Sequence, residues 1–118
     1  MAKYEPLTIS DEQLAALDAE HDDVMVFKGD AELAPWLCVV RRPTAEEALA
    51  YKTMASDPMK KTSANVKLVT ALSVYPKKDT AEWQRQYSRW PFFPDGLVNN
   101  DRFEAFCGMK GVIDAREK

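Results

Sequence analysis

The stretch that decides the fold runs from Val24 to Ser56 and reads VMVFKGDAELAPWLCVVRRPTAEEALAYKTMAS. Two of its segments, Val24–Lys28 and Trp36–Arg41, are rich in the β-branched and aromatic residues that favour strands. Gly29 and Asp30 interrupt the chain between them, and so short a connection favours antiparallel pairing. The sequence therefore predicts a small β-hairpin as the nucleus of the domain.

The clearest helix start follows the second of these strands. Pro43 has no backbone N–H to donate, so the strand is expected to end there. Thr44 is suited to be an N-cap, and Glu47 stands three residues later, where a capping box requires an acidic or amide side chain. The helix is expected to stop before Asp57-Pro58, because the residue before a proline disfavours helical backbone.

Further short helices are predicted on both sides of this unit. Ser10 and Gln13 form a capping-box pattern for an early helix, whose narrow apolar stripe of Leu14 and Leu17 indicates a peripheral position. The later helices are expected at Ala64–Val74, which should be the most buried, after a cap at Asp79, and at roughly Leu97–Cys107. The predicted fold class is α+β: a small antiparallel β-hairpin, about residues 24–28 and 36–41, packed with four to five short α-helices.

Length and composition fit one globular domain over residues 1–118. The chain is 46% hydrophobic and 30% charged, which is ordinary for a folded domain. Residues 1–8 are predicted to be a loose arm and residues 109–118 a flexible tail. The net charge is -3, yet the first 23 residues carry seven acidic side chains against one lysine. This acidic lead suggests that the first helix lies against a mildly basic body partly through charge.

The composition also predicts a cytoplasmic protein. No apolar run resembling a signal peptide opens the chain, and no segment approaches the ~20 apolar residues that a membrane helix needs. Cys38 lies in an apolar strand and Cys107 beside Phe106, so both are expected to be free thiols that pack as small hydrophobic groups. A disulfide between them, or a reactive thiol, is the alternative.

No motif of catalysis or cofactor binding is found in the sequence. His21, the only histidine, stands beside Asp22 and Asp23, but a zinc site needs three or four converging ligands, so a solvated turn is favoured. A phosphate site at Lys60 and Lys61 is likewise less favoured than a solvated loop, because no glycine or aromatic framework surrounds the two lysines. We therefore expect no enzymatic activity, no cofactor and no metal.

Aromatic residues gather in the second half of the chain. Trp83, Tyr87 and Trp90 are spaced to form one stripe on a helix, while Arg85 and Arg89 fall on another face. This separation favours packing over stacking with single-stranded nucleic acid. The turn Pro91-Phe92-Phe93-Pro94 is too apolar for a linker, so it either fills the core or forms an exposed apolar patch.

The order of these motifs gives a family resemblance. VVRRPT leads into the acidic-capped helix EEALAYKTM, a later helix ends in LSVYP, and the turn WPFFPDGLVNN precedes a last helix that closes on CG. Over about Val24–Gly108, this order resembles the small tail assembly chaperones of tailed bacteriophages. The acidic helix before Val24 and the aromatic turn Trp90–Phe93 depart from that pattern, which leaves the partner and the oligomeric state open.

The resemblance implies a non-enzymatic assembly factor in the cytoplasm of a bacterial host. Such proteins bind the long, helical tape-measure protein while tail tube subunits gather, and many have a longer form made by ribosomal frameshifting. An exposed strand edge would suit an extended client, and would also allow pairing with another copy of the chain. The alternative functions are a minor structural virion protein or a small host-directed protein-interaction module. No nucleic acid or membrane is expected as a partner.

The expected client surface consists of large aromatic side chains. For each of them, burial in the core is the competing interpretation. The candidate protein-binding residues are Trp36, Trp83, Trp90, Phe92 and Phe93.

Overall fold

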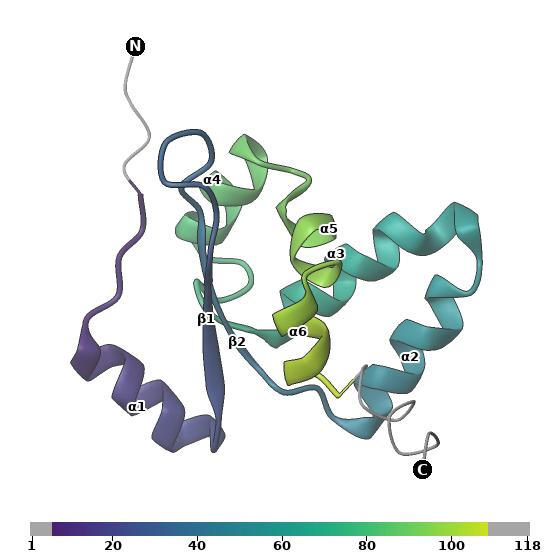
Figure 1. Cartoon of the computed structure of the whole chain (residues 1–118), viewed down its shortest axis with the longest axis horizontal. Helices are drawn as coiled ribbons and strands as arrows, with labels where there is room; N and C mark the ends of the chain where they lie inside the picture. The colour runs from purple at the N-terminus through teal and green to yellow at the C-terminus, as the bar shows by residue number, and fades with distance from the viewer. Residues whose placement is uncertain (1–5, 109–118) are drawn as a thin grey trace.

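The structure is a computed structural model, and it describes residues 6–108 (Figure 1). The predicted α+β class is confirmed: helices surround a three-stranded antiparallel sheet in this part of the chain. Residues 1–5 of the predicted arm and the whole predicted tail lie outside the described residues. The elements in chain order are α1 (Asp11–His21), β1 (Val24–Lys28), β2 (Leu37–Arg41), α2 (Ala45–Ala55), the single turn η1 (Pro58–Lys60), α3 (Lys61–Leu72), β3 (Ser73–Tyr75), α4 (Ala81–Arg89), α5 (Phe93–Val98) and α6 (Asp101–Phe106).

The predicted hairpin forms two of the three strands of the sheet. β1 and β2 pair antiparallel, with Val26 opposite Val39 and Phe27 opposite Cys38. β2 begins one residue later than expected, at Leu37, and its first four residues are buried. The strand order is β1-β2-β3, so this buried strand occupies the middle.

The third strand was not expected from the sequence. The helix predicted over Ala64–Val74 ends at Leu72, and the next three residues form β3. Tyr75 pairs with Val39 and Ser73 with Val40, with an irregular register between the two pairs. The prediction was wrong here because the local pattern is helical, whereas the second edge of the buried β2 needs backbone partners.

Helix starts were placed correctly where the capping pattern is complete. Ser10 and Thr44 both close capping boxes, with Gln13 and Glu47. α3 does not start after Ser63 as predicted, but at Lys61, directly after η1.

Two further helix boundaries differ from the expected ones. The cap of α4 is Thr80 and not Asp79, which adopts a positive φ of 68° in the preceding turn. The single last helix predicted over Leu97–Cys107 is divided into α5 and α6, because the Asn100 side chain accepts hydrogen bonds from the backbone N–H groups of Arg102 and Phe103 and starts a new helix. The turn predicted at residues 91–94 runs directly into α5.

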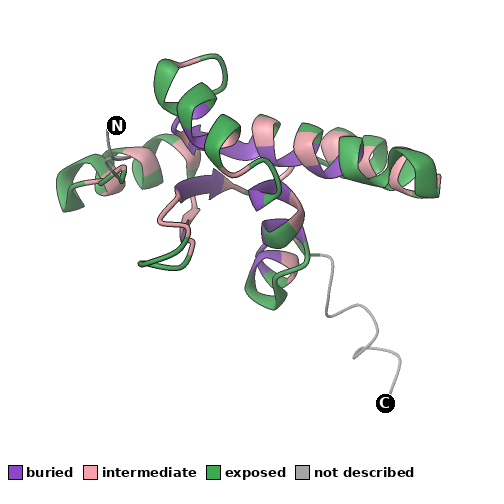
Figure 2. Cartoon of the chain, turned by 90° about the horizontal axis from the view of Figure 1, so that it is seen from above, coloured by how far each residue is buried: buried purple, intermediate pink, exposed green. Residues whose placement is uncertain are grey.

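The two faces of the sheet are covered unequally. Phe27, Cys38 and Val40 face the main core, which is completed by residues of α3, α4, α5 and α6. Val39 lies on the opposite face, where α1 crosses the sheet (Figure 1). α3 contributes five buried residues, as its expected burial predicts, whereas α1 and α2 contribute none. Figure 2 shows the buried residues concentrated in the middle of the molecule and the outer helices largely exposed.

A buried glutamine completes the hydrogen bonding of β2 at its first residue, Leu37, which does not pair with β3. The Gln86 side chain is fully buried on α4. Its Nε2 donates to the carbonyl oxygen of Leu37 at 2.9 Å, and its Oε1 accepts from the Leu37 backbone N–H at 2.9 Å. The primary amide thus pairs with the strand as a neighbouring peptide group would, and it fixes α4 to the start of β2.

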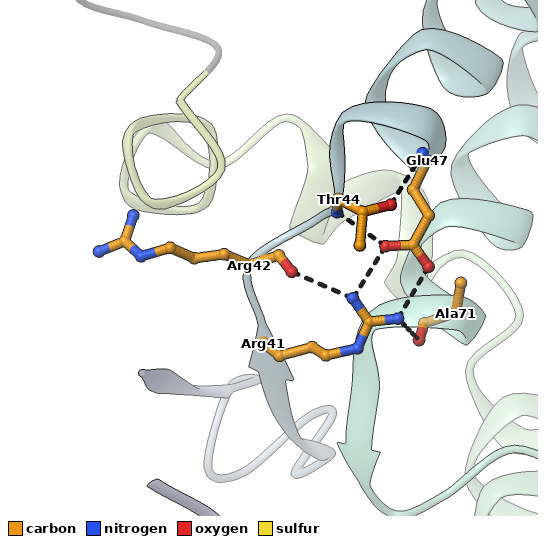
Figure 3. A network of polar contacts seen from close by, with 5 residues as sticks. All are labelled: Arg41, Arg42, Thr44, Glu47 and Ala71. Carbon is orange, nitrogen blue, oxygen red and sulfur yellow. Dashed lines mark hydrogen bonds and ion pairs between the residues drawn. The ribbon is translucent and has the colours of Figure 1, made fainter. Parts of the chain in front are cut away.

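A second network fixes the end of β2 to α2 and α3 (Figure 3). The guanidinium of Arg41 donates to both carboxylate oxygens of Glu47, at 2.8 and 2.7 Å, and to the Ala71 carbonyl oxygen at 3.2 Å. Glu47 also accepts from the backbone N–H of Thr44, so one carboxylate serves both the cap and the ion pair. These hydrogen bonds, chiefly those from Arg41, lower the pKa of Glu47 to about 2.

The neighbouring arginine, Arg42, connects the end of β2 to the start of β1 and to α6. Arg42 forms an ion pair with Asp23 at 2.6 Å, donates to the Phe106 carbonyl oxygen, and lies 4.3 Å from the centre of the Phe106 ring. Asp23 belongs to the acidic first 23 residues but follows α1. Within residues 6–108, α1 itself forms no ion pair with the rest of the protein. Both side chains of the pair are about half exposed, and the ion pair itself therefore adds little stability.

Replacing Gln86 by alanine should destabilise the fold strongly. The Gln86→Ala variant leaves the buried N–H and C=O groups of Leu37 without partners, and we expect the free energy of unfolding to fall by about 2 to 4 kcal/mol. Urea denaturation measures the change. Gln84→Ala, two residues earlier on the exposed side of α4, is the matched control and should change stability by less than about 0.5 kcal/mol. Equal effects of the two substitutions would contradict the role given to Gln86.

The Arg41–Glu47 pair should make stability depend on pH in the acid range. Because the folded pKa of Glu47 lies near 2, below its usual value of 4.5, the pair stabilises the fold fully above that usual value. The contribution is lost as the pH falls from about 4.5 to about 2. With a quarter of each side chain exposed, we expect a loss of about 1 to 2 kcal/mol.

Urea denaturation of the Glu47→Gln variant over this pH range tests the assignment. The variant should be less stable than the parent protein at neutral pH and should lose less stability on acidification. Glu82→Gln, in the first turn of α4, changes an exposed carboxylate and should leave the parent pH profile intact. If the Glu47→Gln variant lost stability with pH as the parent protein does, the pH dependence would not come from the Arg41–Glu47 pair.

Candidate protein-binding surface

Three of the predicted binding residues meet in one aromatic cluster. The ring of Phe93, at the start of α5, lies 5.1 Å from Trp36 and 5.5 Å from Trp83, measured between ring centres. Tyr87, which was not among the predicted binding residues, completes the cluster at 6.5 Å from Phe93. Offset and edge-on aromatic pairs of this kind stabilise a core by about 0.5 to 1.5 kcal/mol beyond the burial of their area.

Burial separates the five predicted residues into three groups. Trp83 and Phe93 are each only 4% exposed, so for these two the core interpretation is correct and the expected surface position is wrong. Trp36 and Trp90 are half-buried and pack against the core with one side only. Phe92 is 75% exposed and is the large aromatic residue that this region presents fully to solvent. The apolar turn thus does both things that its composition allows: one ring fills the core and its neighbour faces outward.

Trp36 also borders a hollow on the surface. A cavity of about 260 Å³ lies beside the indole and is lined by Pro6, Leu7 and Pro35 together with the end of β1. Gly29 packs directly against Trp36 and the loop. A Cβ at this position would lie 2.4 Å from the indole Nε1 and 2.0 Å from the Ala34 carbonyl oxygen. A side chain at position 29 would therefore displace both the tryptophan and the loop.

A second, larger hollow lies under α1. Its volume is about 460 Å³, and it is bounded by Leu17 of α1, by Tyr75 of β3 and by residues at the start of α4. Leu7 lines this hollow as well as the one at Trp36, so the segment before α1 runs between them. The Tyr75 hydroxyl donates to the Thr8 carbonyl oxygen at 2.7 Å and fixes that segment. These lining residues were missed because the arm and the late tyrosine show no joint pattern in the sequence.

β1 presents a free edge next to the hollow at Trp36. Residues of an antiparallel strand direct their backbone groups alternately towards the partner strand and away from it. The Gly29 N–H donates to Trp36 and the Val24 N–H donates to Asp18 of α1, which places the backbone groups of Val26 and Lys28 on the outer edge. Neither residue has an outward backbone partner among residues 6–108. An unpaired edge of this kind accepts an added strand.

The two cysteines and the histidine are the candidates for thiol chemistry or metal binding. Cys38 and Cys107 are free thiols, and burial raises their pKa values to about 12 and about 11, so both are protonated at neutral pH. Across residues 6–108, no three side chains of the metal-binding types come close enough together to hold an ion. The His21 Nε2 atom lies 3.1 Å from a carboxylate oxygen of Glu20.

The fold and the surface together define a small α+β protein with a free strand edge beside an apolar hollow. No protein-family model, curated protein or solved structure matches the chain. None of the helices in the described part of the chain has the length and apolar content required to cross a membrane.

The two adjacent phenylalanines should respond very differently to truncation. Phe93→Ala empties the centre of the aromatic cluster and should lower the free energy of unfolding by about 3 to 5 kcal/mol. Phe92→Ala removes a ring that is 75% exposed and should change it by less than about 0.5 kcal/mol. Urea denaturation of the two variants provides the comparison, each serving as the control for the other. Similar losses would show that Phe92 is packed and not free to bind a partner.

Proposed function

We propose that this protein is a non-enzymatic phage tail assembly chaperone that binds the tape-measure protein and tail tube subunits during tail assembly. The observation that carries the proposal is the unpaired edge of β1, which lies beside the apolar hollow at Trp36. A chaperone must hold a client before its final partners are available, and it needs a site that accepts backbone and apolar side chains without a fixed sequence. The edge and the hollow together meet that requirement.

Binding would proceed by strand addition. A client segment in extended conformation would accept from and donate to the outward backbone groups of Val26 and Lys28. Alternate side chains of the added strand point to one face of the sheet, and those near its end would reach the hollow at Trp36. Phe92 adds an exposed aromatic side chain to the apolar surface available for a client. The order of motifs from VVRRPT to WPFFPDGLVNN, which resembles the phage tail assembly chaperones, supports a tail protein as the client.

The test is co-expression with the tape-measure protein of the same genome, followed by affinity purification of the tagged chain. We expect the client to co-purify and to stay soluble in the presence of this protein. Lys28→Pro is the diagnostic variant, because it removes an outward N–H and leaves the hydrogen bonds between β1 and β2 intact. Lys28→Ala is the matched control, since it removes the same side chain and keeps the N–H.

The outcomes discriminate between the functions considered. Client recovery that is lost with Lys28→Pro and retained with Lys28→Ala supports strand addition. Absence of co-purification while circular dichroism shows the protein to be folded would count against a chaperone. Recovery of the protein from purified mature particles would favour a structural virion component, because an assembly chaperone leaves before the particle is complete.

A further inference from the structure

The hairpin formed by α2, η1 and α3 exposes a face that the rest of the protein does not cover. α2 has no buried residue, and its main contacts are with α3 and η1. On the open side, the two helices enclose a groove of about 870 Å³, which continues into a smaller hollow of about 220 Å³. Ala50, Met54 and Lys67 line both, so the groove is continuous along the hairpin. Leu49 stands over it with 66% of its surface exposed.

Residues of the groove recur at the spacing of a helix-packing face. On α2 and just beyond it, the lining residues fall three or four positions apart, and the same holds from η1 along α3. This is the spacing with which helices of a bundle meet. α3 already uses its buried side for the main core, whereas α2 packs chiefly on α3 and has no buried residue of its own. The open face therefore has the pattern of a half-completed helical bundle.

The two rims of the groove carry opposite charge. Glu46 and Asp57 lie at the two ends of the α2 side, and Lys67 and Lys60 lie at the corresponding ends of the α3 side. Across residues 6–108, Glu46, Lys60 and Lys67 form no ion pair with one another or with any other side chain. The charges are thus available to a partner, and that partner must be basic opposite α2 and acidic opposite α3.

We propose that the partner is a second copy of this chain, and that two α2–α3 hairpins form a four-helix bundle. A twofold axis parallel to the helices places α2 of each copy over α3 of the other. Glu46 then faces the partner's Lys67, and Asp57 at the tip faces the partner's Lys60. The alternative twofold arrangement lays α2 antiparallel on the α2 of the partner. Glu46 then faces the partner's Asp57, and the like charges repel each other. The sign pattern therefore selects one arrangement, and that arrangement is self-complementary.

Size limits the strength of this contact. α2 and α3 contain 11 and 12 residues, so the interface is small for a specific dimer. We expect a reversible dimer with a dissociation constant on the order of 10 μM, driven by burial of Leu49 and oriented by the charged rims. The contact lies apart from the β1 edge and does not depend on the function proposed above.

Sedimentation velocity over a concentration series from about 1 to about 200 μM tests the dimer. Leu49→Glu places a charge in the centre of the contact and should weaken association at least about tenfold without unfolding the monomer, because Leu49 is exposed there. Leu33→Glu is the matched control: Leu33 is 82% exposed in the β1–β2 connection, away from the groove, and its substitution should leave association unchanged.

A charge exchange gives an independent test. The Glu46→Lys variant alone and the Lys67→Glu variant alone should each be monomeric. In either homodimer, both contacts between positions 46 and 67 would bring like charges together. An equimolar mixture of the two variants should recover dimers, since both Lys–Glu pairs are restored in the heterodimer. A parent chain that stays monomeric over the whole series would overturn the proposal. So would a dimer that survives Leu49→Glu or a mixture that does not associate, and loss of the dimer with Lys28→Pro alone would assign it to the β1 edge.

Discussion

The hydrogen-bonding demand of one buried strand organises this protein. β2 is buried along most of its length, so water cannot satisfy its backbone groups and each must find a protein partner. β1 satisfies one edge. On the other edge, β3 reaches only Val39 and Val40, and Gln86 supplies the missing peptide-like partner at Leu37. β1, β3 and α4 are thus all bonded to the five residues of β2.

The same strand sets the position of the helices that follow it. Arg41 and Arg42 stand at its end and turn to opposite sides, the first to α2 and α3, the second to Asp23 and α6. The guanidinium groups of the two arginines therefore fix the direction in which the chain leaves the sheet. Each forms several hydrogen bonds at once, and lysine cannot reproduce this geometry. The consequence is a rigid central body from which the α2–α3 hairpin projects on one side, while α1 lies across the other face of the sheet (Figure 1).

Local chemistry explains which parts of the fold could be predicted from the sequence. The hairpin and the capping boxes at Ser10 and Thr44 depend on residues within a few positions of one another, and these predictions were correct. β3 and the role of Gln86 depend on contacts 33 to 49 positions apart, which no local pattern carries. The candidate surface was predicted only in part for a related reason: periodicity placed Trp83 on an apolar stripe, but only the packing of Phe93 against it decides which aromatic rings face inward. Phe92 and Phe93 are adjacent in sequence and have opposite environments, a distinction that composition does not provide.

The thin cover on the second face of the sheet has a consequence for cooperativity. α1 has no buried residue. It is held by its own cap, by the hydrogen bond that the Val24 backbone N–H donates to Asp18, and by the neighbouring segment fixed at Tyr75. Such an element can detach at a free-energy cost well below that of global unfolding. Amide protons of α1 would then exchange with solvent long before those of β2, and each subglobal opening would briefly uncover Leu37 and Val39 while the principal core stays intact.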